Sequence, residues 1–242
     1  MTKNSPGGQR APLKMREISR LPSSKQALRP ADVAADSYHH GALREALLNA
    51  AEQILLEQGM EGFTLRACAR RAGVSHGAPA HHFGDVKGLL TEFAARGYER
   101  LTGMTKTYRA QALPGSRAQV AAVGQAYIDF ALAHRAQFQL MYRADRINEN
   151  DVHFIAASMA SYDQFDSALA NFLNENSSFD DAIIAKQLLA WSAVHGFASL
   201  LLEGRLRYFF NGKSRDEFAH QMGRQMIALL SHALTASETE LK

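Results

Sequence analysis

Apolar residues recur at helical spacing along most of the chain from residue 41 onward. Between Gly41 and Gln58 they form one stripe, with charged and amide side chains on the opposite side, which predicts an amphipathic helix. Gly59 is placed to end it. The stripe consists of Leu43, Leu47, Ala50, Ala51, Ile54 and Leu55.

Two short helices joined by a tight turn are predicted between Phe63 and Phe83. Thr64 is placed to cap the first, Gly73 to close its end in the left-handed conformation, and Ser75 to cap the second. This punctuation predicts a helix-turn-helix, whose second helix places its early residues on base edges in the major groove. A helical hairpin that only packs in a core is the alternative. The small apolar face of the first helix consists of Leu65, Cys68, Ala69 and Ala72.

The rest of the chain also has helical periodicity, so the predicted fold class is all-α. A long helix follows Gly84-Asp85 and runs to about Tyr108, and a later pattern is interrupted near residues 134–137. We expect a three-helix DNA-binding domain at 38–87, followed by a larger helical domain at 88–242. Further helices are predicted over residues 119–142, 151–172, 179–202 and 214–234.

Composition excludes several classes of function. No stretch of roughly 18 residues is free of charge and polarity, and the basic N-terminus lacks the apolar run of a secretory signal, which favours a cytoplasmic protein with no membrane partner. The single cysteine, Cys68, cannot form an internal disulfide, and its apolar helical face favours a core position over a metal site. Residues 101–242 contain no glycine-rich phosphate loop and no paired-carboxylate motif, so neither an enzyme nor a cofactor is predicted.

Residues 1–37, which we call the N-terminal arm, carry a larger net positive charge than the whole chain. Seven basic groups stand against three acidic ones, a net of +4, which leaves −1 for the remainder because the whole chain is +3. Rich in Pro, Ser and Gly, the arm is expected to be disordered. It either contacts DNA phosphates or a minor groove, or is a solvated tail with no role. The basic residues are Lys3, Arg10, Lys14, Arg16, Arg20, Lys25 and Arg29.

Residues 38–100 resemble the N-terminal domain of the TetR family of bacterial transcription regulators. The run from Trp191 to Gly204, WSAVHGFASLLLEG, resembles the Trp-x-x-x-His-Gly signature of one TetR subgroup. The first resemblance rests on an ordered set: Gly59, Phe63-Thr64-Leu65-Arg66, Ala69, Ala72-Gly73-Val74-Ser75, His82-Phe83 and Leu89-Leu90.

The resemblance implies roles at the DNA. Thr64 would touch a phosphate while capping its helix, and Arg66 would lie at the groove, where it pairs with guanine or holds a phosphate. Base contacts would come from the start of the recognition helix, where only His76 has a long hydrogen-bonding side chain, so sequence readout is expected to be sparse. The full DNA-binding set is Thr64, Arg66, Ser75, His76, Gly77, Ala78, His81, His82 and Lys87.

The chain departs from the family pattern in the recognition helix and just after it. Pro79 and Ala80 stand where leucine and a phosphate-binding tyrosine are usual. Because proline has no amide hydrogen, we expect a short or late-starting recognition helix, with His81 and His82 recovering the phosphate contact. The lysine that usually opens the fourth helix is Val86 here, with Lys87 one place later.

The resemblance also implies a homodimer on a palindromic operator, formed by the last two long helices, and a small-molecule effector among the middle helices. The aromatic-rich cavity candidates suggest an apolar or aromatic compound, although each has ordinary core packing as its alternative. The expected function is a repressor released by this effector; the alternatives are a helical interaction protein and an all-helical enzyme. The effector candidates are Tyr127, Phe130, Phe138, Met141, Tyr142, Phe154, Tyr162, Trp191 and His195, and the interface candidates are Ile184, Leu188, Trp191, Met222, Met226 and Leu230.

Overall fold

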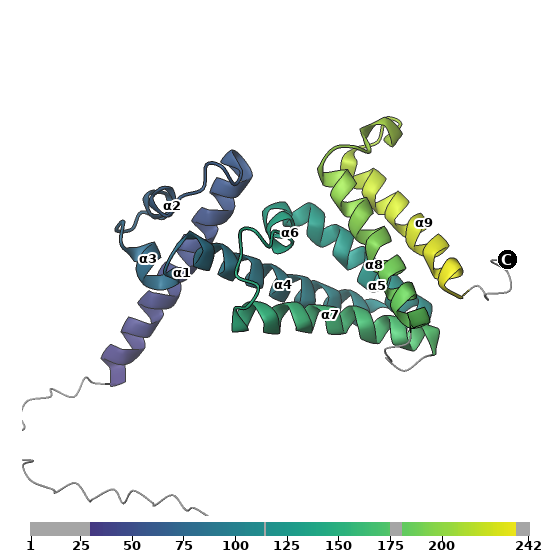
Figure 1. The fold of residues 1–242 in the computed structure, drawn as a ribbon, viewed down its shortest axis with the longest axis horizontal. Helices are drawn as coiled ribbons and strands as arrows, with labels where there is room; N and C mark the ends of the chain where they lie inside the picture. The colour runs from purple at the N-terminus through teal and green to yellow at the C-terminus, as the bar shows by residue number, and fades with distance from the viewer. Residues whose placement is uncertain (1–29, 114, 175–180, 236–242) are drawn as a thin grey trace, which may run out of the picture. The chain divides into compact units, whose positions relative to one another are not determined.

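The computed structural model describes residues 30–113, 115–174 and 181–235, and every regular element in these ranges is helical. The chain divides into two units, Met1–His40 and Gly41–Lys242. The first α-helix begins in the first unit and continues into the second (Figure 1). The helices are α1 (Pro30–Gln58), α2 (Leu65–Ala72), α3 (Ala78–Phe83), α4 (Val86–Gln111), α5 (Ser116–Ala133), α6 (Arg135–Met141), α7 (Val152–Leu173), α8 (Asp181–Leu202) and α9 (Arg215–Thr235), with a 3-10 turn, η1 (Arg207–Phe209).

Helix α1 begins at Pro30, well before the predicted start at Gly41. Residues 30–37, for which disorder is predicted from the sequence, are therefore helical in the structure. Proline suits the first turn of a helix, and the alanines that follow it favour helix, although they form no apolar stripe. The basic residues of the N-terminal arm all lie outside the described residues, so the prediction that the arm contacts DNA remains untested.

Helices α1 to α3 pack with the start of α4 to form what we call the head. Leu47 and Ile54 of α1, Cys68 of α2 and Leu89 of α4 are fully or almost fully buried in one core. Gly88 allows α4 to follow α3 so closely, because a β-carbon there would collide with the carbonyl oxygen of Phe83. Cys68 donates from Sγ to the carbonyl of Leu47, and burial raises its thiol pKa to about 11. The expected core role of this cysteine is confirmed.

The remaining helices form a bundle with the rest of α4. Helix α4 packs along α7 and against α5 and α6, while α8 and α9 run side by side as an antiparallel pair (Figure 1). A second core lies among α5, α7, α8 and α9. The interruption predicted near residue 134 is confirmed, because α5 ends at Ala133 and α6 begins at Arg135.

Candidate DNA interface, effector cavity and the network between them

Helix α2 is closed at both ends as predicted. The Oγ1 atom of Thr64 accepts a hydrogen bond from the amide of Ala67 at 3.0 Å, and Gly73 ends the helix with φ of 69°. Both terminal nitrogens of the Arg71 guanidinium donate to the Glu57 carboxylate of α1, at 2.7 and 2.6 Å. This bidentate pair fixes α2 against α1 and uses Arg71 structurally.

The recognition helix α3 starts late, as predicted. Its N-cap is Gly77, its first residue is Ala78, and the buried Pro79 lies in its first turn. The prediction that Ser75 caps this helix was wrong, because no side chain does so. Ser75 instead lies in the preceding turn, where its carbonyl accepts from the amide of Ala78 at 3.1 Å.

The predicted DNA-contacting residues are mostly exposed, on α2, the turn, α3 and the start of α4. No hydrogen bond or ion pair joins the Arg66 side chain to another described residue. Ala78 and His82 are half-buried, and the His82 ring lies between those of His81 and Phe83, 5.3 and 6.3 Å away between centroids. The exposed members of the set are Thr64, Arg66, Ser75, His76, Gly77, His81 and Lys87. Their contacts with DNA remain predictions.

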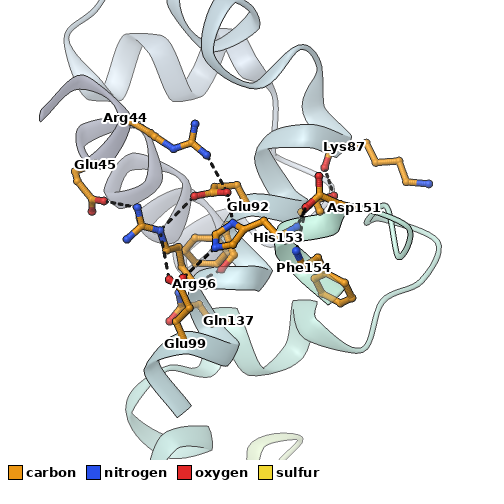
Figure 2. A network of polar contacts seen from close by, with 12 residues as sticks. Arg44, Glu45, Lys87, Glu92, Arg96, Glu99, Gln137, Asp151, His153 and Phe154 are labelled. Atoms are coloured by element: carbon orange, nitrogen blue, oxygen red, sulfur yellow. Dashed lines mark hydrogen bonds and ion pairs between the residues drawn. The ribbon is translucent and has the colours of Figure 1, made fainter. Parts of the chain in front are cut away.

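A network of charged side chains centred on Glu92 connects the head to the bundle (Figure 2). Glu92 lies on α4 and is only 8% exposed. Its carboxylate pairs with Arg44 of α1 at 2.8 Å, with Arg96 of α4 at 3.2 Å and with the Nδ1 atom of His153 of α7 at 2.9 Å. Three helices therefore meet at one buried carboxylate. Helical periodicity in the sequence could not predict this meeting, because it does not show which helices pack together.

His153 bridges two carboxylates. Its second ring nitrogen, Nε2, lies 2.9 Å from Glu99, and this hydrogen bond and the one to Glu92 raise the imidazole pKa, against the effect of partial burial. Burial opposes ionisation of Glu92, yet its hydrogen bonds from Arg44 and His153 lower its pKa overall. The geometry therefore favours a charged His153 between two charged carboxylates.

A cavity of about 510 Å³ lies in the bundle, between α4, α5, α7, α8 and α9. Six of the nine predicted effector residues line it: Tyr127, Met141, Tyr142, Phe154, Tyr162 and Trp191. Two further residues of the lining, Tyr98 and Glu149, were not predicted from the sequence. The helical pattern gave Tyr98 only a place on an apolar face. Glu149 lies between two helices, where helical periodicity gives no signal.

The other three candidates lie elsewhere. Phe138 and His195 line a second cavity of about 350 Å³ beside the C-terminal end of α1, and Tyr142 borders both cavities. Phe130 is fully buried in the first core and lines neither of these two cavities, so its role in effector binding remains a prediction.

Hydrogen-bonded rings form the wall between the two cavities. The Tyr127 hydroxyl lies 2.7 Å from the Tyr142 hydroxyl and 2.7 Å from Nδ1 of His195. Burial raises the pKa of both tyrosines and lowers that of His195, so all three are neutral near pH 7. Neutral polar groups inside an aromatic lining can orient a ligand through hydrogen bonds.

The interface candidates on α8 and α9 differ in their accessibility. Leu188 is 53% exposed and Trp191 is also exposed, whereas Ile184, Met222 and Met226 are half-buried. Leu230 packs in the second core and lines the cavity, so it is not available to a partner subunit. Its neighbour Leu229 is 72% exposed. The interface itself remains a prediction.

Comparisons with known proteins agree with this architecture. The family described as bacterial regulatory proteins, tetR family, matches residues 47–93, and the tetracyclin repressor-like C-terminal domain matches residues 120–226. The chain belongs to the TetR family. The narrower resemblance of residues 191–204 to the Trp-x-x-x-His-Gly subgroup of TetR proteins remains a prediction.

Individual proteins match over different extents. The HTH-type transcriptional regulator BetI of Burkholderia thailandensis is 36% identical over 86 residues, which are 36% of this chain and 44% of BetI, so the match spans less than half of that relative. A structure of a protein with unknown function from Rhodococcus sp. RHA1 is 35% identical, covering 80% of this chain and 98% of that one, with a TM-score of 0.63. The TetR family regulator PfmR from Thermus thermophilus shares the fold at 17% identity, with 77% and 97% coverage and a TM-score of 0.57. Among the described residues of this chain, no helix is long and apolar enough to cross a membrane.

Proposed function

We propose that this protein is a sequence-specific DNA-binding transcription regulator that binds a palindromic operator as a homodimer. The exposed residues of α2 and of the turn before α3 form the DNA-contacting surface, with Arg66 as its main cationic group. Because α3 is short and starts late, few side chains reach base edges, and phosphate contacts and DNA shape carry more of the specificity. As a bacterial regulator of this kind it acts in the cytoplasm, where the chromosome lies.

Control by a small molecule is the second part of the proposal. It is supported by helix α4, which contributes residues to the head, to the charged network and to the cavity. This one helix contributes Leu89 and Phe93 to the head core, Glu92 to the charged network, and Tyr98 and Thr105 to the cavity. A ligand that displaces Tyr98 therefore moves the helix on which the head is packed. We propose that the effector releases the protein from DNA, which makes it a repressor.

Selection of bound sequences from a random duplex library by the purified full chain tests the DNA-binding part. We expect a palindrome whose half-sites lie about one helical turn, ~34 Å, apart, as two recognition helices of a twofold dimer require. Recovery of sequences without a common motif would contradict the proposal and favour a helical interaction protein.

A further inference from the structure

The 510 Å³ cavity has an aromatic lining that contains an acidic side chain and no basic one. Rings from α4, α5, α7 and α8 surround it, and no lysine, arginine or histidine is among the described residues that line it. Glu149 is the one ionised side chain of that lining. The aromatic members are Tyr98, Tyr127, Tyr142, Phe154, Tyr162, Phe165 and Trp191.

Glu149 lies where this cavity meets solvent. It belongs to the segment between α6 and α7, and its side chain is exposed even though it borders the cavity. No ion pair or hydrogen bond joins it to another described residue. Burial is the main reason that the pKa of Tyr98 is raised, and the charge of Glu149 adds to it, so this carboxylate acts on the cavity wall.

The guanidinium of Arg109 is engaged away from the cavity. Arg109 of α4 donates to the carbonyl of Gln164 at 3.2 Å and to the Ser167 hydroxyl at 3.0 Å, and it does not line the cavity. An anionic ligand would therefore enter an apolar space beside Glu149 with no cation to pair with, which is costly. A cationic ligand instead gains from the carboxylate and from the electron-rich faces of aromatic rings.

We infer that the effector is an organic cation with an apolar or aromatic body, held by the aromatic lining with its positive charge beside Glu149. The inference rests on the proposed role of this cavity as the effector site, and it narrows the expected ligand from apolar compounds in general to cationic ones. The cavity volume lies within the range of roughly 300 to 1,000 Å³ that is usual for sites of drug-sized ligands.

Two probe ions of nearly equal size and opposite charge test the sign of the preferred ligand. Tetraphenylphosphonium and tetraphenylborate each carry four phenyl rings around one central atom, so they differ mainly in charge. Trp191 lines the cavity and is the one tryptophan of the chain, so its fluorescence reports binding. We expect the phosphonium to bind at least roughly tenfold more tightly than the borate. Equal affinities, tighter binding of the borate, or no binding of the phosphonium would each overturn the inference.

A charge-neutral variant identifies the residue responsible. Glu149→Gln should weaken phosphonium binding by roughly three- to tenfold and leave borate binding unchanged or stronger. Glu61→Gln is the matched control, because it removes the same charge from a side chain that is 92% exposed and outside the cavity lining. Unchanged phosphonium affinity in Glu149→Gln, or an equal loss in Glu61→Gln, would overturn the assignment to Glu149.

Operator binding separates failure of this inference from failure of the proposed function. Wild-type protein that binds its selected duplex but shows no preference for the phosphonium would retain the regulator proposal and lose only the ligand class. Protein that prefers the phosphonium but binds no specific duplex would retain the cationic site and lose the regulator proposal. If both are correct, the phosphonium weakens operator binding in wild type and does so less in Glu149→Gln at the same concentration.

Discussion

Two arginines of α2 have different surroundings, and this difference separates structural from DNA-contacting roles. Arg71 is held in a bidentate pair with Glu57 of α1, whereas Arg66 is exposed and has no partner among the described residues. A guanidinium that is free in the unbound protein loses no internal contact when it binds a base or a phosphate. Arg66, which the family resemblance also places at the groove, is therefore free to contact DNA.

Replacing Arg66 tests this directly. Arg66→Ala should weaken specific operator binding by ~1 to 3 kcal/mol, with little change in thermal stability. Fluorescence anisotropy with the selected duplex measures the loss, and Arg205→Ala, which removes an arginine 74% exposed in the loop after α8, is the control. An unchanged ratio of operator to random-DNA affinity in Arg66→Ala would remove Arg66 from the residues that contact bases.

At the scale of elements, most residues that begin or end helices were predictable, whereas residues that join helices were not. Gly73 and the break at His134 follow from local chemistry that the sequence displays. The start of α1 at Pro30 was missed because alanine-rich helix lacks an apolar stripe, and Ser75 was misassigned because Pro79 delays α3. The Glu92 network depends on three helices that converge only in the folded chain.

The two predicted caps give a matched pair of substitutions. Thr64→Ala should lower the free energy of unfolding by about 1 kcal/mol, because it removes the oxygen that accepts from the Ala67 amide. Ser75→Ala should change it by less than about 0.5 kcal/mol, because the Ser75 side chain is exposed and caps no helix. Urea unfolding of both variants measures the difference, and equal losses would contradict the assigned cap positions.

The network of α1, α4 and α7 should make stability depend on pH through His153. The folded state raises the His153 pKa, so its contribution is fully present below the unfolded value of about 6.5 and is lost as pH rises through the higher folded value. The stability advantage of wild type over His153→Gln should therefore be larger at pH 6 than at pH 8.5. Denaturant unfolding at both values tests this.

A matched control for His153→Gln comes from an exposed histidine. His76→Gln removes a histidine that has no carboxylate partner among the described residues, so its effect should differ little between the two pH values. An equal stability difference for His153→Gln at pH 6 and pH 8.5 would show that the ion pairs with Glu92 and Glu99 contribute nothing measurable.

At the scale of the whole molecule, the proposed regulation requires a second copy of the chain. Leu188 of α8 and Leu229 of α9 expose large apolar surface on the helices proposed to form the dimer. Exposed apolar side chains of this kind mark interaction surfaces when they cluster. Which side chains face outward could not be predicted from periodicity alone, because both helices carry apolar residues on more than one side.

A charged substitution on this surface tests the dimer. Leu188→Asp should convert the protein to a monomer at micromolar concentration and weaken operator binding at least roughly tenfold, because one head alone occupies one half-site. Leu113→Asp is the control, since Leu113 is 77% exposed but lies just after α4. Sedimentation velocity measures the mass, and an undisturbed dimer in Leu188→Asp would place the interface elsewhere.

The most direct test of sequence-specific DNA binding by this TetR-family protein compares two duplexes of equal length and composition. One carries the selected palindrome and the other its scrambled sequence, and the wild-type protein is titrated against each by fluorescence anisotropy at physiological salt. We predict that the palindrome binds at least about a thousandfold more tightly, as is usual for specific regulators. Affinities within a fewfold of each other, both falling steeply with salt, would reduce the interaction to electrostatic association and contradict the proposed function.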